Sequence, residues 1–449
     1  MHQANRAGRV ALLVLIAGLF GCSKGNIQAG QGATSASILI NTGTPTATSP
    51  NDEVIDFELT VTAASLTGGS NPAVVTNTTP VEFIHQGGAF HPLALVTVPN
   101  GTYSGITLNV SNATIVVVDP SSKAVTPLTA VLASSVITVP FSSPVVVSGS
   151  PLVINLQLDV ANSLTFTGTG ANLAPQFTVT SSQVAPVASQ NEDTGEVEAT
   201  GIITAVSGTS FTVQPVNTAQ TLAFVTDSNT QFTDGISSVG QVATGMIVTV
   251  QAFTQSDGSL LARNVESETL SATGAQLEGL ITSVTGSPVT SLGITTQSAV
   301  ATTAANAPAT GTTVSVPITT STQFSVESNH VPGSFPAFDA ADIGLGQRVV
   351  VNSETQSTNP ASATADKLKL QEQALTGTIS GLSGGIFVLI PSTTSAFFSL
   401  TGISSVTVNT LPSTVVSGTT LANGATVTVR GLLFVNGTAY TMIAARVTP

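Results

Sequence analysis

Charged side chains, tryptophan and cysteine are scarce in this chain of 449 residues. Asp, Glu, Lys and Arg make up only 7% of it, and it has no Trp and a single Cys. Typical globular domains are about 25% charged. One cysteine excludes an internal disulfide, so packing alone must stabilise the fold. Hydrophobic residues still make up 41%, which is enough for real cores and excludes wholesale disorder.

Basic residues are the scarcer of the two charged kinds. The chain has 10 Lys+Arg against 23 Asp+Glu, a formal net charge of −13. An acidic surface repels phosphate backbones, so we expect no nucleic-acid partner. The few Lys and Arg are scattered along the sequence and predict no basic patch for an anionic surface.

Thr, Ser, Asn and Gly take the place of the missing charges. Thr favours pleated, half-buried surfaces, and Gly and Asn supply turns. This composition predicts an all-β protein. The length is enough for about three domains.

The first residues have the pattern of a targeting segment. Arg6 and Arg9 precede an apolar run over residues 10–20. That run is too short for a membrane-spanning helix, which needs about 20 residues, and is typical of a signal peptide. Residues 1–21 are therefore predicted to be a signal peptide, and residues 22–36, rich in Gly, Gln and Ser, a flexible tether.

The sequence Leu19-Phe20-Gly21-Cys22 resembles the lipobox of bacterial lipoproteins. The resemblance implies cleavage before Cys22, a diacylglycerol group on its thiol, further acylation of its amine (palmitate is a typical chain), and anchoring in the cell envelope. Ser23, which follows, implies the outer membrane where the usual sorting rule applies. Two other interpretations stay open: a secretory peptide cut nearby without lipid, and a buried cysteine.

Residues 37–187 alternate apolar and polar side chains with period two. Three segments show it: 57–63, 106–111 and 154–160. The pattern, with turn signals such as Pro99-Asn100-Gly101 between the segments, predicts short antiparallel strands in a β-sandwich-like domain.

Beyond an acidic linker at residues 188–196, three elements recur in the same order. A strand led by Gly201 returns at Gly279 and Gly377, and another led by Gly245 returns at Gly346 and Gly424. Thr230-Gln231-Phe232 returns at 322–324 and faintly around Val406, and each block closes on a strand, at 262–265, 367–370 and 445–447. This order predicts three small β-barrels, over residues 197–270, 276–373 and 374–449. The stretch Ser291 to Thr320 is predicted to be an inserted loop or hairpin.

Two family resemblances rest on these segments. Residues 98–103 with 106–108, and the later 156–164, resemble a bacterial lipoprotein domain of unknown function, family 4382. The three repeats are similar to domain-of-unknown-function family 5666. Neither family brings a known catalytic residue.

Gly381-Leu382-Ser383-Gly384-Gly385 matches the G-x-S-x-G nucleophile elbow letter for letter. An elbow needs a strand-to-helix turn and a later histidine. No histidine follows His330, and the repeats place plain hairpin turns at the same point. We therefore expect Ser383 to lie in a hairpin turn, and we predict no catalytic residue.

Metal sites find little support in the sequence. His85 and His91 are separated by a Gly pair and, with His330, lack cysteine or carboxylate partners, so a solvated loop is the expected setting and no zinc site is predicted. The clusters Asp52-Glu53-Asp56 and Glu192-Asp193-Glu196 lack the spacing of a calcium loop. Charge that keeps a loop or linker solvated is the expected role, with weak calcium binding left open.

Without Trp, and with only Tyr103 and Tyr440, the chain offers few platforms for sugar stacking, which counts against a glycosidase and, less strongly, a lectin. The sequence favours a non-catalytic envelope lipoprotein that needs no cofactor, with barrels extended like beads and a structural, adhesive or scaffolding role. Its partners would be the membrane, through Cys22, and other envelope proteins or glycans. The alternative is a binding protein that captures a glycan or small molecule at the barrel mouths, and a hydrolase comes third.

Overall fold

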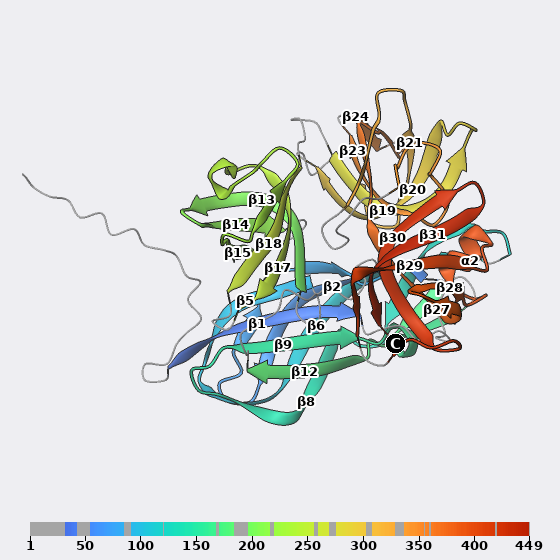
Figure 1. Ribbon diagram of the computed structural model, residues 1–449. Coiled ribbons are helices and arrows are strands. Elements are labelled where there is room, and N and C mark those ends of the chain that lie inside the picture. The colour runs from blue at the N-terminus through green and yellow to red at the C-terminus, as the bar shows by residue number, and fades with distance from the viewer. Residues whose placement is uncertain are drawn as a thin grey trace, which may run out of the picture.

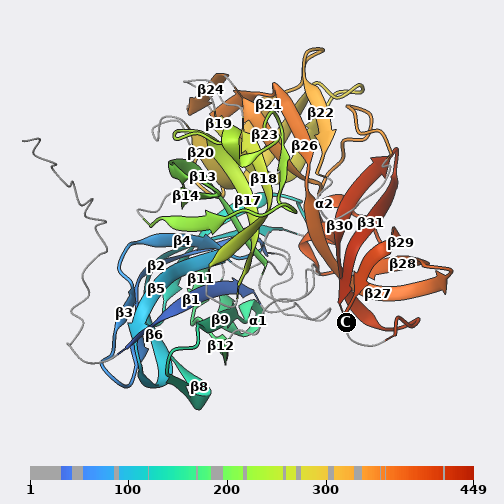
Figure 2. The ribbon, with the colours of Figure 1, turned by 60° about the vertical axis from the view of Figure 1, so that its left-hand side comes forward.

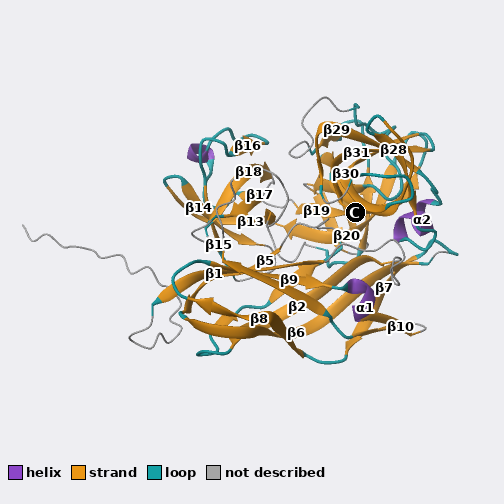
Figure 3. Cartoon of the chain, turned by 60° about the horizontal axis from the view of Figure 1, so that its bottom comes forward, coloured by secondary structure: helices purple, strands orange, loops and turns teal. Residues whose placement is uncertain are grey.

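The computed structural model describes residues 32–42, 54–84, 91–119, 121–167, 170–183, 196–215, 220–255, 259–268, 275–301, 308–327, 336–353, 355–358, 361–417 and 420–448. In these ranges the chain is almost entirely β-strand, which confirms the predicted all-β class (Figures 1 and 3). The helices found there are short: α1 (Val160–Ser163), α2 (Ala396–Thr401) and the 3-10 helix η1 (Val239–Gln241).

Two sheets form the N-terminal part. Sheet 1 has the strand order β12-β9-β1-β5, and its strands are β1 (Ala33–Thr42), β5 (His91–Pro99), β9 (Leu152–Leu158) and β12 (Phe177–Gln183). Sheet 2 has the order β10-β11-β7-β6-β2-β3, with β4 also on β2 and β8 also on β6. Its strands are β2 (Val54–Thr67), β3 (Ala73–Val75), β4 (Thr79–Glu82), β6 (Gly101–Val118), β7 (Val125–Leu132), β8 (Val136–Val147), β10 (Leu164–Thr167) and β11 (Gly170–Leu173).

Sheets 1 and 2 share one apolar core, and we call the pair the sandwich. Ile38 and Ile154 of sheet 1 lie in the same buried cluster as Phe57, Leu59 and Leu108 of sheet 2. These are residues on the apolar side of alternating strands, and successive side chains of a strand point to opposite faces. The alternation therefore determines which face of each sheet lies inside.

The sandwich departs from the expected pattern in two ways. The strand pairs β1–β9 and β11–β7 are parallel, where the sequence analysis expected antiparallel strands throughout. Parallel partners are joined by long connections, which local turn signals do not reveal. Strand β1 also begins at Ala33, so its first four residues lie within the predicted tether.

Sheet 3 (residues 196–268) has the order β15-β14-β13-β17-β18-β16. Its strands are β13 (Glu196–Ser207), β14 (Ser210–Pro215), β15 (Leu222–Val225), β16 (Gln231–Thr233), β17 (Ile247–Thr254) and β18 (Leu260–Glu268). An additional pairing of β15 with β18 joins the strands into a ring.

Sheet 4 (residues 275–370) has the order β22-β26-β23-β19-β20-β21-β25-β24. Its strands are β19 (Ala275–Thr285), β20 (Ser291–Ala301), β21 (Thr313–Pro317), β22 (Gln323–Val326), β23 (Arg348–Ser353), β24 (Thr355–Thr358), β25 (Ala361–Thr364) and β26 (Lys367–Leu370). The stretch Ser291 to Thr320 is therefore not an insertion. Its strands β20 and β21 pair with β19 and with each other inside the sheet, and the Ala/Thr-rich composition concealed that role.

Sheet 5 (residues 372–448) is a closed barrel of β27-β28-β29-β31-β30. Its strands are β27 (Glu372–Ser383), β28 (Ile386–Pro391), β29 (Val406–Val416), β30 (Thr426–Asn436) and β31 (Ala439–Thr448).

Sheets 3, 4 and 5 share glycines at equivalent positions. A Cβ on Gly201, Gly279 or Gly377 would lie 2.2, 2.1 or 2.6 Å from a backbone carbonyl oxygen of the next strand. No real side chain tolerates that distance, so the close approach of the two strands requires glycine. The glycines before β17, β23 and β30 all have positive φ, which favours glycine for a different reason: Gly245 (90°), Gly346 (78°) and Gly424 (84°).

A threonine recurs in all three sheets and locates the third repeat. The hydroxyls of Thr230, Thr322 and Thr414 each donate to a backbone carbonyl, at 2.7, 2.8 and 2.6 Å, which lies in the closing strand in sheets 3 and 5 and two residues before it in sheet 4. The backbone N–H three residues earlier donates to each hydroxyl. The third copy thus lies at Thr414, and its placement near Val406 from the sequence is wrong.

The sheets do not extend like beads. Leu39 and Val153 of the sandwich lie in the apolar cluster of sheet 3, and Leu432 and Phe434 of sheet 5 lie in that of sheet 4. A smaller cluster joins Ile55 and other sandwich residues to Leu400 of α2 and Leu280 of sheet 4. Sheets 3, 4 and 5 stand together on one side of the sandwich (Figures 1 and 2). The outward faces that the alternation marks as polar are partly used for this packing.

Candidate functional site

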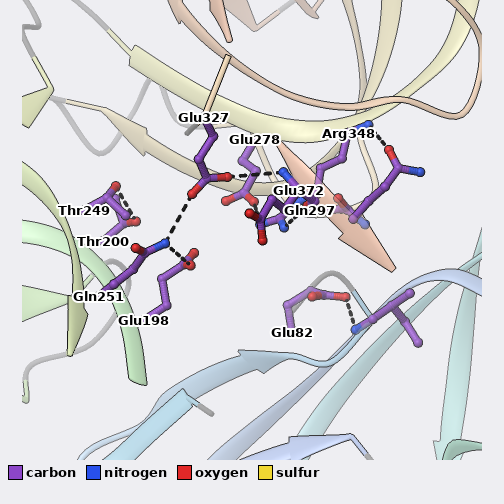
Figure 4. Close-up of polar contacts among 12 residues, drawn as sticks. Glu82, Glu198, Thr200, Thr249, Gln251, Glu278, Gln297, Glu327, Arg348 and Glu372 are labelled. Atoms are coloured by element: carbon purple, nitrogen blue, oxygen red, sulfur yellow. Dashed lines mark hydrogen bonds and ion pairs between the residues drawn. The ribbon is translucent and has the colours of Figure 1, made fainter. Parts of the chain in front are cut away.

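Charged side chains gather where sheets 3, 4 and 5 meet (Figure 4). Most are buried, although they stand on the outward faces of their strands. The group is Glu198, Gln251, Glu266 and Glu268 of sheet 3, Glu278, Glu327, Arg348, Asn352 and Lys369 of sheet 4, and Glu372 with Gln373 of sheet 5. We call this group the charged junction.

Arg348 lies at its centre. Its guanidinium is paired with Glu278, and its Nη1 donates to the Glu372 carbonyl oxygen at 2.7 Å. The backbone N–H of the same residue donates to Oε1 of Gln373 at 2.8 Å. Burial disfavours the charged guanidinium, but Glu278, Glu198 and Glu327 outweigh it, so the pKa of Arg348 lies above its ordinary value. One cation thus links carboxylates of sheets 3 and 4 to the backbone of sheet 5.

Two lysines of β26 reach across to sheet 3. Nζ of Lys367 and Nζ of Lys369 lie 2.7 and 3.3 Å from Oδ2 of Asp234, and Lys369 is also paired with Glu266. Burial alone would raise the pKa of Asp234, but the hydrogen bond from Lys367 and the charge of Lys369 bring it below its usual value. Burial lowers the pKa of the Lys369 ammonium, and Asp234 and Glu198 partly offset that effect.

Amide side chains complete the contact between sheets 3 and 4. Nε2 of Gln251 donates to Oε1 of Glu327 at 3.2 Å and lies 3.5 Å from Oε2 of Glu198 (Figure 4). Nδ2 of Asn352 donates to Oε2 of Glu268 at 3.1 Å. Burial raises the pKa of Glu268, and hydrogen bonds from Asn352 and Gln276 oppose the shift only in part.

A second cluster, the acid cluster, lies where the sandwich meets sheet 4. Glu58 and Glu82 are direct cross-strand partners, and the fully buried Asp56 lies two residues before Glu58. Sheet 4 covers them with neutral groups: Thr310 donates to Oε2 of Glu58 at 2.9 Å, and Gln297 donates to the Ile55 carbonyl oxygen at 2.9 Å. Burial raises the pKa of Asp56 well above its usual value, with a further contribution from Glu58. Burial also raises the pKa of Glu58, against the hydrogen bond from Thr310.

Asp56 therefore corrects one expectation from the sequence. It does not solvate a loop, because its side chain has no exposed surface and stands within β2. Its predicted partners Asp52 and Glu53 lie outside the described residues, as do Glu192 and Asp193 of the other cluster. The backbone of Glu196 begins β13. Over the ranges that the structure describes, no three His, Cys, Asp or Glu side chains are arranged to hold a metal ion.

The histidines are placed only in part. His85 and His330 lie outside the described residues. His91 is the first residue of β5, opposite Ile40, and not part of a solvated loop. Burial of its imidazole lowers the pKa of His91 to about 4. The side chain is thus neutral at neutral pH and packs as part of the sheet.

Ser383 ends β27 and faces Ile386 across a tight hairpin. Gly384 and Gly385 both have positive φ, of 59° and 85°. The expected hairpin turn is confirmed, and the strand-to-helix geometry of a nucleophile elbow is absent at this position.

The two tyrosines are buried. Tyr103 has no exposed surface and its hydroxyl donates to the Pro99 carbonyl oxygen at 2.7 Å. Tyr440 donates to the Leu345 carbonyl oxygen at 3.0 Å and packs edge-on against Phe397. Burial raises the pKa of Tyr440 to about 12. Neither ring offers an open face on which a sugar could stack.

The predicted anchor lies outside what the structure describes. Cys22 and the whole signal segment 1–21 are not among the described residues. No helix in the described ranges is both long and apolar enough to cross a bilayer.

Sequence reasoning missed the charged junction because it treated outward strand positions as solvated. One signal was present. In a chain with so few charges, Asn264, Glu266 and Glu268 alternate along one strand, and Lys367 and Lys369 alternate along another. Opposite charges at alternate positions of two strands could have been paired.

Three comparisons with known proteins bear on the chain. Residues 200–266, which lie within sheet 3, match the model of a family described as Domain of unknown function (DUF5666). No curated protein matches the chain. A solved structure from Streptococcus pneumoniae TIGR4, described as a multidomain protein with nucleic acid binding domains, is 12% identical over 55% of this chain and 73% of its own, with a TM-score of 0.12. That score is too low to indicate a shared fold. The matched family segment therefore runs from the strand that contains Gly201 into the closing strand β18.

Proposed function

We propose that the chain is a lipid-anchored protein of the bacterial cell envelope with a non-catalytic role as a scaffold or adhesin. The observation that carries the proposal is the use made of its few charged groups. Three of the ten basic residues make contacts between sheets: Lys367 and Lys369 with Asp234 of sheet 3, and Arg348 with the Glu372 carbonyl oxygen of sheet 5. Side chains that hold sheets together support a structural role, because catalysis needs reactive groups gathered at an accessible site.

The proposed location in the cell envelope rests on the sequence. A positive segment, an apolar core too short to span a bilayer and a directly following Cys22 support acylation of that cysteine, and Ser23 supports the outer membrane as destination. We further propose that sheets 4 and 5 are copies of the family module matched in sheet 3. The shared glycines and the shared threonine hydrogen bond support this. The sandwich remains a candidate for the family 4382 domain.

Acylation is tested by labelling cells with a palmitate analogue and fractionating them. The wild-type chain is expected to take up label and remain with the outer membrane, and globomycin is expected to block its processing. Cys22→Ala should lose both label and membrane retention, while Ser23→Ala should keep them. Retention of Cys22→Ala in the membrane without label would contradict the anchor.

The scaffold role is tested by purifying the tagged protein from membranes under mild crosslinking. Co-purification of the same envelope proteins in repeated experiments supports the role. Glycan-array or thermal-shift hits, with no protein partner, would favour the alternative of a glycan- or small-molecule-binding protein.

A further inference from the structure

The contact between sheets 3 and 4 differs from the other contacts between sheets. Sheet 3 shares an apolar cluster with the sandwich, and sheet 4 shares one with sheet 5 and another with the sandwich and α2. No buried apolar cluster of the described residues contains members of both sheet 3 and sheet 4. The two sheets therefore meet through polar and charged side chains.

The charges on the two faces are complementary. Sheet 3 presents the carboxylates of Asp234, Glu266 and Glu268, and sheet 4 presents the ammonium groups of Lys367 and Lys369 together with the carboxylate of Glu327, which accepts a hydrogen bond from Gln251. Alternation of the strands places the apolar members Val265, Leu368 and Leu370 inside their own sheets. Each sheet thus keeps a complete core of its own when the two faces part.

The closed and the separated forms of such a contact are close in free energy. Two charged faces lose hydration when they meet, and that cost can equal the Coulomb energy gained. When they part, water restores the hydration of every group, and no apolar surface is exposed to oppose the separation. Salt screens the buried pairs of the closed contact only weakly, but it stabilises the open form, in which the like charges of each face are exposed to solvent and their repulsion is screened over a Debye length of about 3 Å at 1 M.

We propose that sheets 3 and 4 form an electrostatic latch that opens reversibly as ionic strength rises, while both sheets stay attached to the sandwich. Sheet 3 turns about its apolar contact with Leu39 and Val153, and sheet 4 is held by Ile55, Leu280 and Leu400. Both sheets rest on the same side of the sandwich, so a small rotation separates the faces (Figure 3). The open form presents the acidic face of sheet 3 to solvent.

The latch is tested by the distance between spin labels at Ser228→Cys and Ser321→Cys, exposed positions on sheets 3 and 4. The full chain carries Cys22→Ala, so that only these two sites are labelled. Between about 0.05 M and about 1 M NaCl the latch predicts a rise on the order of tenfold in the fraction at long distance. Neither label alters a side chain of the contact itself. A distance distribution that does not change with salt would therefore overturn the proposal.

Variants then identify the charges responsible. Lys367→Gln with Lys369→Gln should give the open distribution already at low salt, whereas Lys123→Gln, on an exposed turn of the sandwich, should leave the closed one unchanged. Lys369→Glu should open the latch, and adding Glu266→Lys should close it again. Failure of the second change to restore the short distance, in a chain whose circular dichroism is that of the wild type, would refute ion pairing as the cause.

Discussion

Sheet 4 contacts sheet 5 and sheet 3, its neighbours along the chain, through side chains of opposite character. Toward sheet 5 it buries Leu432, Phe434 and Ile443 in its own core. Toward sheet 3 it offers Lys367, Lys369 and Asn352 to carboxylates. The hydrophobic effect stabilises the first junction and does not require the side chains to take a particular orientation. The second junction depends on paired charges and hydrogen bonds. The outward residues of the strands in sheet 4 thus give its two contacts their different chemistry.

The same outward positions explain why the middle sheet differs from its neighbours. Cross-strand hydroxyl pairs, Thr200 with Thr249 and Thr376 with Thr428, stand in sheets 3 and 5 at 3.0 and 2.8 Å. In sheet 4 the residue before the shared glycine is Glu278, which pairs with Arg348. A pair of hydroxyls suits a face that is partly open to water, whereas Arg348 of this ion pair also donates to the Glu372 carbonyl oxygen of sheet 5.

The largest effect is expected from Arg348→Ala. The change removes the buried cation that is paired with the partly buried Glu278, together with its hydrogen bond to the Glu372 carbonyl oxygen. Breaking a buried pair by removing one partner costs about 3–5 kcal/mol. Urea unfolding of the full Cys22→Ala chain measures the loss. The exposed Lys123→Ala should change the free energy of unfolding by less than about 0.5 kcal/mol. A similarly small change for Arg348→Ala would show that the junction is not centred on this cation.

Leu432→Ala probes the apolar junction. Leu432 has no exposed surface and lies in the core of sheet 4. Such a truncation costs about 2–5 kcal/mol, and the cost should be the same at low and high salt, in contrast to the effect of the lysine changes on the latch. Val416→Ala, at an exposed valine of sheet 5, serves as the matched control. A salt-dependent cost for Leu432→Ala would erase the distinction between the two junctions.

Asp56→Asn tests the acid cluster, where sheet 4 contributes the neutral side chains of Gln297 and Thr310. The pKa of Asp56 is raised, so the native fold gains stability from this group at pH values below its ordinary pKa and loses it as pH rises through the raised value. The variant removes the buried charge. We expect it to be more stable than the wild type at pH 7 and to lose that advantage as the pH falls toward 4.

The charge of Glu58 acts on Asp56, and Glu58 is kept unchanged in this experiment together with the other members of the acid cluster and its cover, Glu82, Gln297 and Thr310. Urea midpoints at several pH values measure the difference. Glu53→Gln, a change close to this cluster in sequence, serves as the control variant. If the urea midpoints of the wild type and of Asp56→Asn depend on pH in the same way, a group other than Asp56 is responsible for that dependence.

Sequence patterns predicted the interior of this protein better than its junctions. The alternation at Phe57, Leu59 and Val61 identified buried positions correctly, and Gly201, Gly279 and Gly377 marked equivalent strands. The period-two pattern separates inward from outward positions, but it does not say what covers the outward ones. The sequence therefore predicted a solvated setting for Asp56, and the contacts of Arg348 with other sheets become visible only in the folded structure. The parallel pairing of β1 with β9 was equally hidden, because its partners are more than a hundred residues apart.

The smallest effect is expected from Glu268→Gln at the charged junction. Glu268 is buried and its pKa is raised, so its charged form is disfavoured by the fold at neutral pH. Hydrogen bonds from Asn352 and Gln276 and the charge of Lys367 oppose that shift, which leaves less to gain than at Asp56. Glutamine keeps the oxygen that accepts from Asn352 and carries no charge to dehydrate, so the closed latch should become slightly more stable at pH 7, by less than about 1 kcal/mol. In the spin-label experiment the salt concentration at half-opening should move upward, and the difference from the wild type should vanish as the pH falls and Glu268 is protonated. A downward shift would mean that the attraction between Glu268 and Lys367 outweighs the cost of burying the carboxylate, and the balance proposed for the latch would lie further toward the closed form.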